Sequence, residues 1–141
     1  MRIGFALGSP KLIKYLNDVK YSFNSYTMDQ TALDLGVASI ENQAYFEETL
    51  HKIIQTRERV KACLTELGFT FRDSKSNFIF ASHKSCPAEE LFEKLKEKDI
   101  YVRYFKKPRI DNYLRITIGT DAEMDEFLAE VEKYLKETGR L

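Results

Sequence analysis

The stretch 113–123 constrains the fold more than any other part of the chain. In residues 113–118, apolar side chains alternate with Tyr, Arg and Thr, which is the period of a half-buried β-strand. Gly119 ends this strand, and the Thr-Asp-Ala-Glu sequence that follows is typical of a capping box at a helix start. The sequence therefore predicts a strand that leads directly into a helix, with Arg115 on the polar side of the strand.

The predicted helix after this strand has one apolar stripe. Its members recur at three- and four-residue steps: Met124, Phe127, Leu128, Val131, Tyr134 and Leu135. Such a stripe packs on the apolar face of a neighbouring element, and the preceding strand offers that face. We therefore expect Arg115 to point away from the core.

The middle of the chain repeats this change between helical and strand periods. After Gly68, two short strands at 69–72 and 77–81 flank a turn-forming segment and predict a hairpin. A helix opening at Cys86-Pro87 and a strand at 100–105 follow. This order predicts an α/β (α+β two-layer) fold, in which helices cover one face of a small mixed or antiparallel sheet.

The N-terminal part has a different character. Residues 2–8 predict an apolar strand, and Ser9-Pro10 predicts a capped, short amphipathic helix. Residues 21–26 read as a polar, aromatic loop without helical period. The segment 27–67 then predicts a long helix, broken near residue 41, that would bridge two parts of a larger body.

Composition excludes several classes of function. The 141 residues carry 22 basic and 22 acidic side chains, so no net charge attracts nucleic acid or an anionic membrane. Cys63 and Cys86 lack the spacing of a zinc site or a disulfide framework. We see no secretory signal and no apolar run of the ~18–20 residues that a membrane span needs. The sequence therefore predicts a cytoplasmic protein without nucleic-acid or membrane partners.

Five segments together resemble the C-terminal part of histidinol-phosphate aminotransferase, within the fold-type I enzymes that use pyridoxal phosphate. Their order and spacing agree over essentially the whole chain, and they are residues 2–5, 21–30, 76–79, 102–103 and 113–120. The resemblance implies that 68–141 is the small C-terminal domain of such an enzyme. It also implies that 27–67 links this domain to a remnant of the cofactor domain at 1–26.

The resemblance assigns a role to three arginines. Arg2 matches the arginine that binds the cofactor phosphate, and Arg115 matches the arginine that holds the anionic group of the substrate. Arg103 resembles a second arginine for the substrate phosphate. A guanidinium suits these roles because it donates two parallel hydrogen bonds to one oxyanion. From the residues alone, a frayed terminus for Arg2 and solvent-facing strand positions for the other two stay open.

Other polar residues give weaker predictions. Asn77 either faces the pocket or bonds neighbouring backbone, and the Gly119 and Thr120 amides serve capping in preference to anion binding. The resemblance places three residues in a loop that approaches a neighbouring subunit: Tyr21, Asn24 and Tyr26. We expect no metal pair at the two histidines, His51 and His83. We expect no binding role for the basic loop, whose charged residues are Lys106, Lys107 and Arg109.

In the resembled family, the lysine that forms the Schiff base precedes the arginine matching Arg2. The resemblance thus places this lysine outside the chain, names no catalytic residue within it, and suggests that Met1 is a truncated or artificial start. The expected parent is a homodimeric enzyme that moves an amino group between histidinol phosphate and 2-oxoglutarate, with glutamate as the amino-acid partner. The fragment itself is expected to be inactive and free of pyridoxal phosphate.

Two alternatives to this function stay open. One is a related enzyme of the same fold, such as a threonine-phosphate decarboxylase or another class I/II aminotransferase. The other is a free-standing, non-catalytic α/β module that binds a ligand or a protein.

Overall fold

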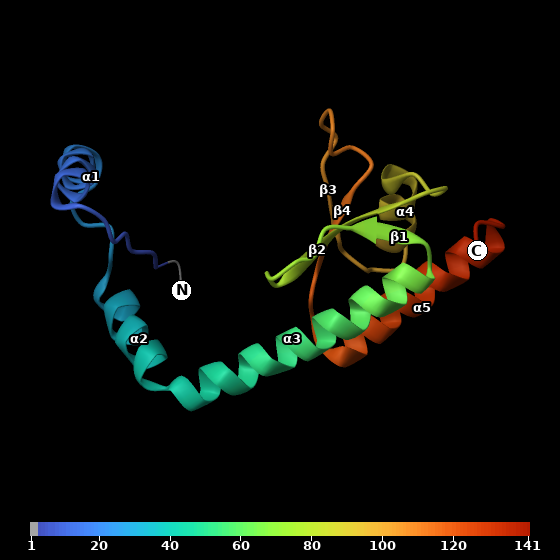
Figure 1. Cartoon of the computed structure of the whole chain (residues 1–141), viewed down its shortest axis with the longest axis horizontal. Coiled ribbons are helices and arrows are strands. Elements are labelled where there is room, and N and C mark those ends of the chain that lie inside the picture. The colour runs from blue at the N-terminus through green and yellow to red at the C-terminus, as the bar shows by residue number, and fades with distance from the viewer. Residues whose placement is uncertain (1–2) are drawn as a thin grey trace. The chain divides into compact units, whose positions relative to one another are not determined.

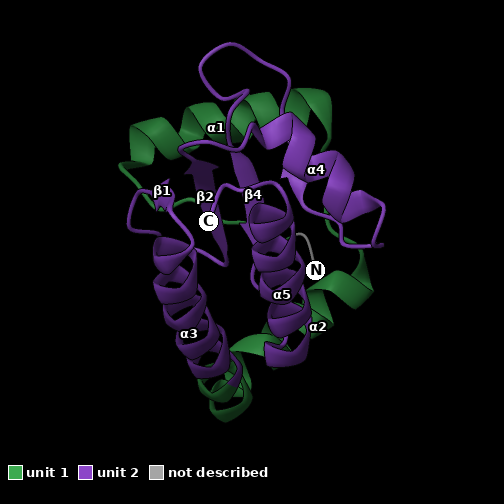
Figure 2. Ribbon diagram, turned by 90° about the vertical axis from the view of Figure 1, so that its right-hand side faces the viewer, with its two compact units in different colours: residues 1–48 green, residues 49–141 purple. Residues whose placement is uncertain are grey.

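The computed structural model describes residues 3–141, which form two compact units. Unit 1 ends at Glu48, and unit 2 comprises Thr49–Leu141. Figure 1 labels the helices and strands, and Figure 2 colours the two units. The elements are α1 (Pro10–Phe23), α2 (Gln30–Glu41), α3 (Gln43–Glu66), β1 (Phe69–Phe71), β2 (Phe78–His83), α4 (Ala88–Lys96), β3 (Arg103–Tyr104), β4 (Leu114–Thr117) and α5 (Asp121–Glu137).

Side chains close to the helix ends define the helices of unit 1. The Ser9 hydroxyl accepts a hydrogen bond from the Leu12 amide at 3.4 Å, which confirms the predicted start of α1. Asp29 caps α2 in the same way. The backbone amide of Asn42 makes the last hydrogen bond of α2, to the Ala38 carbonyl. The side chain of Asn42 accepts from the Tyr45 amide at the start of α3. The predicted break near residue 41 is therefore confirmed, because one asparagine both ends a helix and begins the next.

Two predictions for unit 1 were wrong. Residues 3–8 form no strand, since within the described part of the chain no backbone pairs with them, and Phe5 and Leu7 are almost fully exposed. The rest of that predicted strand, Arg2, lies outside the described residues. The segment 21–26 is only partly a loop, because α1 continues through Phe23, and the Asn24 amide still bonds the Lys20 carbonyl.

The described part of unit 2 contains a four-stranded sheet in the order β1-β2-β4-β3, with every neighbouring pair antiparallel. The predicted hairpin is confirmed as β1 and β2. The strand expected at 100–105 shortens to the two residues of β3. The Ile100 amide bonds the Leu95 carbonyl, and the Lys107 amide bonds the Phe105 carbonyl. Because the two ends of the segment 100–105 make these local bonds, only its middle pairs with β4.

Alternation along the central strands divides the sheet into two faces. Ile79, Ala81, Leu114 and Ile116 are buried on the core face. Helices α3, α4 and α5 contribute the facing apolar side chains, and α3 and α5 run side by side (Figure 2). The predicted two-layer α/β fold with helices on one face is confirmed. The opposite face, called here the open face, carries Arg115.

The predicted strand-to-helix junction is also confirmed. The Thr120 hydroxyl accepts from the Glu123 amide at 3.4 Å, while the Glu123 carboxylate accepts from the Thr120 amide at 2.7 Å. Gly68 ends α3 with a φ of 84°, a conformation that glycine adopts without strain. None of the helices that the structure describes combines the length and apolar character needed to cross a bilayer.

Candidate functional site

The two arginines predicted to hold the substrate lie directly opposite each other. Arg103 of β3 and Arg115 of β4 are Cα partners in the antiparallel ladder, so their side chains leave the sheet on the same side. That side is the open face, because the neighbours of Arg115 along β4, Leu114 and Ile116, are buried in the core. Both arginines are exposed. The fold thus places side by side two cations that are far apart in sequence.

No carboxylate neutralises this pair among the described residues. Three other arginines of unit 2 each have an acidic partner: Arg57 bonds Glu58, Arg59 bonds Asp121 and Asp125, and Arg140 bonds Glu90. Like charges directly opposite each other on a sheet are destabilising. An anion bound between Arg103 and Arg115 would remove that repulsion.

Aromatic rings support the two guanidiniums. The Arg115 guanidinium carbon lies 5.7 Å from the Phe78 ring centroid and 5.9 Å from that of Phe105, and the Arg103 guanidinium carbon lies 5.2 Å from Phe105. A ring face attracts a cation but takes none of its N–H donors. These four residues, called here the arginine–aromatic cluster, therefore hold two positive groups in place and leave their donors available for an oxyanion.

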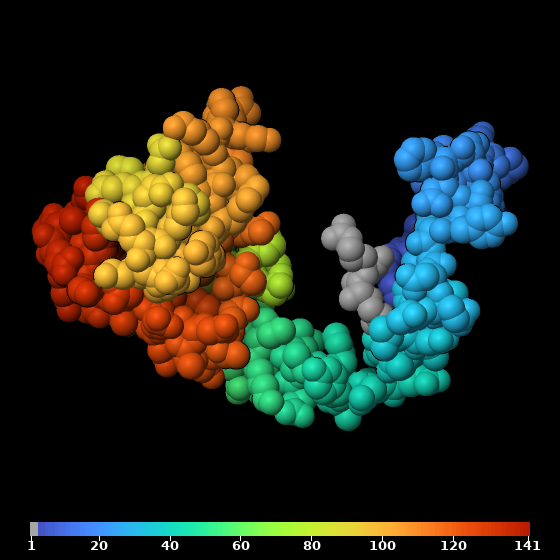
Figure 3. All heavy atoms as spheres, turned by 180° about the vertical axis from the view of Figure 1, so that it is seen from behind, coloured from blue at the N-terminus to red at the C-terminus, as the bar shows by residue number. Residues whose placement is uncertain are grey.

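The open face continues beyond this cluster as a basic and aromatic surface. Phe80 of β2 is the Cα partner of Arg115, and its ring stacks on Tyr113 with centroids 4.8 Å apart. A pocket of about 670 Å³ adjoins these rings, and its charged lining residues are Arg72, Lys75, Arg109 and Asp73, which pairs with Lys75 at 3.2 Å. The loop that carries Arg109, between β3 and β4, projects from unit 2 (Figure 3).

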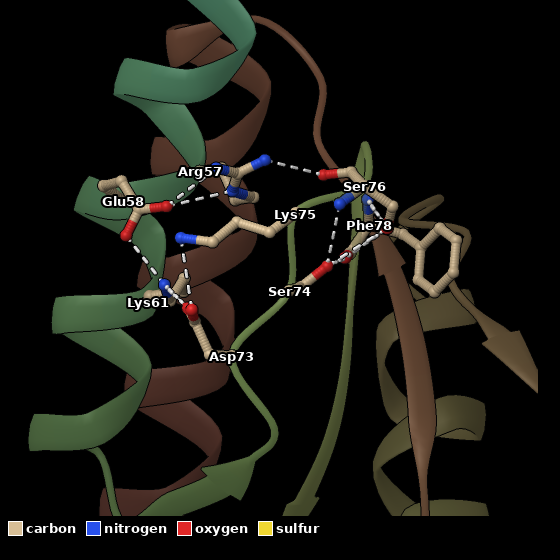
Figure 4. Close-up of polar contacts among 8 residues, drawn as sticks. All are labelled: Arg57, Glu58, Lys61, Asp73, Ser74, Lys75, Ser76 and Phe78. Atoms are coloured by element: carbon tan, nitrogen blue, oxygen red, sulfur yellow. Dashed lines mark hydrogen bonds and ion pairs between the residues drawn. The ribbon is translucent and has the colours of Figure 1, made fainter.

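The main polar feature that sequence reasoning missed is Arg57, which is only 5% exposed. It lies in the apolar stripe of α3, at helical spacing from Ile53, Val60 and Leu64. Its Nη1 donates to the Ser76 carbonyl at 3.0 Å, and its Nε and Nη2 donate to Glu58 (Figure 4). A charged residue inside an otherwise apolar stripe was the signal that could have identified it.

A second missed set of contacts joins α3 to the start of α5. The Thr56 hydroxyl donates to Asp121 at 2.8 Å, and Arg59 bonds Asp121 at 3.0 Å and also Asp125. The hydroxyl of Thr56 and the guanidinium of Arg59 hold the pKa of Asp121 below its usual value. These contacts therefore join α3 to the first two turns of α5.

Comparison with known proteins identifies the family. The family Aminotransferase class I and II matches residues 1–131. The chain belongs to this family. A histidinol-phosphate aminotransferase from Brachyspira hyodysenteriae is 52% identical over 136 residues, which are 96% of this chain and 38% of the relative. One from Clostridium acetobutylicum is 50% identical over 133 residues, or 94% of this chain and 38% of the relative.

Solved structures share the fold of this chain. A putative histidinol-phosphate aminotransferase from Erwinia carotovora superposes with a TM-score of 0.84 at 22% identity, over 98% of this chain and 38% of that one. The Sinorhizobium meliloti histidinol-phosphate aminotransferase, solved in complex with pyridoxal-5'-phosphate, gives 0.78 at 21% identity, over 94% and 36% of the two chains. The chain thus spans well under half the length of the relatives it matches.

The remaining predicted residues of the chain fall into three groups. Arg2 lies outside the described residues. Tyr21, Asn24 and Tyr26 are exposed and belong to unit 1. Asn77 is exposed, and its carbonyl accepts from the Ile118 amide at 2.9 Å. A functional role for each of these side chains stays a prediction.

The backbone after β4 serves capping, as predicted. The Thr120 amide bonds Glu123, and the Gly119 amide points to the Met124 sulfur at 3.2 Å. In the basic loop, Lys106 pairs with Glu89 at 2.8 Å, while the exposed Lys107 and Arg109 show no ion pair among the described residues.

The two histidines of the chain lie in different environments. His51 is exposed on α3, whereas His83 is buried in β2. The ring of His83 bonds the Leu67 carbonyl at 2.9 Å and accepts from the Ser85 amide at 3.2 Å. Burial lowers the pKa of His83. No group of three or more metal-ligating side chains occurs within residues 3–141.

Proposed function

We propose that this chain is the C-terminal part of a pyridoxal-phosphate-dependent histidinol-phosphate aminotransferase. The parent enzyme moves an amino group between histidinol phosphate and 2-oxoglutarate in histidine biosynthesis. The observation that carries the proposal is the arginine–aromatic cluster, in which Arg103 and Arg115 are adjacent and have no acidic partner among the described residues. About half of the residues are identical to relatives that bear this name.

The two arginines hold the anionic group of the substrate. A phosphate monoester carries a charge near −2 at neutral pH, so a second guanidinium strengthens its binding. Both partners of a transamination carry an anion that the same site must receive, and a fixed anion orients the reacting end of the molecule. Phe78 and Phe105 keep the guanidiniums in place between substrates.

Pyridoxal phosphate supplies the electron sink for the chemistry when it is bound. Within this chain, Arg2 is the residue proposed to contact its phosphate, and no lysine of the chain is proposed to bind the cofactor covalently. Residues 1–26 would belong to the cofactor domain, 27–67 would form the link, and 68–141 would form the small domain. The intact enzyme would be a cytoplasmic homodimer, with Tyr21, Asn24 and Tyr26 approaching the neighbouring subunit.

A chimaera tests the proposal. It joins the upstream part of the Brachyspira hyodysenteriae relative to the start of this chain. The chimaera should transaminate histidinol phosphate. Replacing Arg115→Ala should raise the KM for histidinol phosphate roughly 10- to 100-fold, the range for one lost charge-assisted interaction. Lys107→Ala is the control, because Lys107 is also exposed, lacks an ion pair among the described residues and does not line the pocket of the open face.

The chimaera also separates the alternatives. A folded, cofactor-loaded chimaera that left histidinol phosphate unchanged would contradict the proposed activity. Unaltered kinetics after Arg115→Ala would remove Arg115 from the substrate site. Release of carbon dioxide from a phosphorylated amino acid would indicate a decarboxylase of the same fold.

The chain without its upstream part should not retain the cofactor. Pyridoxal phosphate added to the 141-residue chain should give no stoichiometric absorbance change that borohydride fixes at a single lysine. Mass spectrometry of the reduced, digested protein measures this. One specifically modified lysine would show that the chain carries its own cofactor site and would contradict the proposed division of the enzyme.

A further inference from the structure

A buried arginine on α3 is connected to the open face of the sheet. Arg57 is only 5% exposed, and a buried charge is costly unless it is paired and hydrogen-bonded. An apolar residue of similar size at such a position is often neutral or stabilising. What an apolar residue could not supply is the bond from Arg57 Nη1 to the Ser76 carbonyl at 3.0 Å. This bond is the specific contribution of Arg57 to the structure.

The carbonyl that Arg57 bonds belongs to a turn built from serine hydroxyls. The Ser76 hydroxyl accepts from the Phe78 amide at 3.3 Å, and the Ser74 and Ser76 hydroxyls both donate to the Phe78 carbonyl. The turn lies between β1 and β2, and the carbonyl of its last residue, Asn77, accepts from the Ile118 amide at 2.9 Å. Phe78 is the first residue of β2 and lies opposite Thr117 of β4. The two serine hydroxyls therefore add bonds to a backbone that the sheet already holds, and the Ser76 carbonyl in turn accepts from Arg57.

The first half of the same turn is also attached to α3. Lys61 bonds Asp73, and the Glu58 carboxylate joins Lys61 to Arg57, with 2.7 Å to the lysine and 2.9 Å to Nη2 of the arginine. Figure 4 shows these side chains on the α3 side of the turn and the Phe78 ring on the side away from α3. One helix thus holds the turn at two points, while the ring extends to the opposite side.

The Phe78 ring is one of the two rings that support Arg115, at 5.7 Å. We propose that Arg57 is a positioning residue for the anion site, which acts through the Ser76 carbonyl and the Phe78 ring on the Arg115 guanidinium. The proposal rests on the proposed function, in which Arg115 holds the substrate anion. Arg57 does not touch the anion, and its effect is to keep Phe78, and so Arg115, in the arrangement that binds it.

The experiment uses the 141-residue chain with inorganic phosphate as the probe. The Nε–Hε signal of Arg115, observed by NMR, should be shifted upfield by the neighbouring rings, and it should move on titration with phosphate. Arg57→Met should return this signal toward the value of a solvated arginine. It should also weaken phosphate binding about threefold, the size expected for one lost exposed cation–π contact.

Arg59→Met is the matched control. It makes the same chemical change on the same helix, but the partners of Arg59 are Asp121 and Asp125 rather than the turn. The control should leave the Arg115 signal and the phosphate affinity unchanged. A double-mutant cycle with Phe78→Leu extends the test, because the effect of Arg57→Met on Arg115 should disappear once the ring is absent.

Each outcome decides a separate question. A folded Arg57→Met chain with the wild-type Arg115 signal and wild-type phosphate affinity would overturn the proposal. If Arg57→Met does not fold, Phe78→Leu takes its place, and unchanged phosphate affinity in that variant would overturn the proposal. Absence of phosphate binding by the unaltered chain would count against the proposed function instead, and the Arg115 signal would still report whether Arg57 positions it.

Discussion

Units 1 and 2 form helices by the same local rules but differ in what these helices bury. Ser9 and Asp29 cap helices in unit 1, and Thr120 caps one in unit 2. Helices α1 and α2 nevertheless contain no buried residue, whereas α5 buries an apolar stripe against the sheet. Local capping therefore sets where a helix begins, while tertiary packing supplies most of its stability.

The apolar side chains of unit 1 make the contrast quantitative. Phe23 is 91% exposed and Val19 is 68% exposed, while Val131 of α5 is fully buried. Unit 2 buries an apolar core within residues 49–141, whereas α1 and α2 of unit 1 bury none of their apolar side chains.

The largest expected difference between the units concerns apolar truncation. Ile116→Ala should destabilise the chain by about 2–5 kcal/mol, because Ile116 is 1% exposed and its loss leaves a cavity. Leu16→Ala in α1 should change the free energy of unfolding by less than about 0.5 kcal/mol, because Leu16 is 55% exposed. Urea unfolding followed by circular dichroism measures both. A similar loss in the two variants would break the comparison.

A smaller difference is expected at the helix caps. Thr120→Ala should lower the free energy of unfolding by about 1 kcal/mol, since it removes the hydroxyl that accepts from the Glu123 amide. Ser9→Ala removes the equivalent acceptor from α1 and should leave the main unfolding transition unchanged. Hydrogen exchange should instead detect faster opening of the first turn of α1. Thr120→Ser is the conservative control and should restore most of the stability.

The smallest effect on the free energy of unfolding is expected from a change of pH, which tests the buried His83 of unit 2. The Nδ1 of His83 accepts from the Ser85 amide, so protonation there would remove that bond. Burial lowers the pKa of His83 in the folded chain, whereas the unfolded chain takes up the proton near pH 6.5. Stability present above about pH 6.5 is therefore lost as the pH falls through the lower folded-state pKa.

His83→Gln isolates this contribution. The difference in unfolding free energy between pH 7 and pH 5 should be smaller in His83→Gln than in the unaltered chain, because carboxylates contribute equally to both. His51→Gln is the matched control, since His51 is exposed on α3. An equal effect of the two substitutions would show that burial of His83 does not shift its titration.

Sequence reasoning succeeded where the signal was local. The alternation at 113–118, the capping box at Thr120 and the glycine at 68 each depend on a few neighbouring residues, and all three are present in the structure. It failed for residues 3–8, where an apolar run was read as a strand. A strand exists only if another strand pairs with it, and within the described residues none does.

The candidate site was partly predictable for the same reason. The residue pattern and the family resemblance named Arg103 and Arg115, but not that they are Cα partners on adjacent strands. Arg57 lies in the helix predicted at 27–67, but its partner, the Ser76 carbonyl, lies beyond the end of that helix, so helical periodicity does not predict the bond. Contacts between backbone groups and distant side chains leave little trace in a sequence.

Periodicity and capping, which act over one or two turns of chain, were sufficient to establish the helices, the central strands and the polar face that carries Arg115. Only the tertiary structure determined which polar and charged groups lie in contact. It placed the two guanidiniums over Phe78 and Phe105, and it brought the Asn112 side chain to the Ala88 amide at the start of α4, where Pro87 supplies no cap. The physical reason is that electrostatic and packing interactions act through space, so their strength depends on distances that only the folded chain defines.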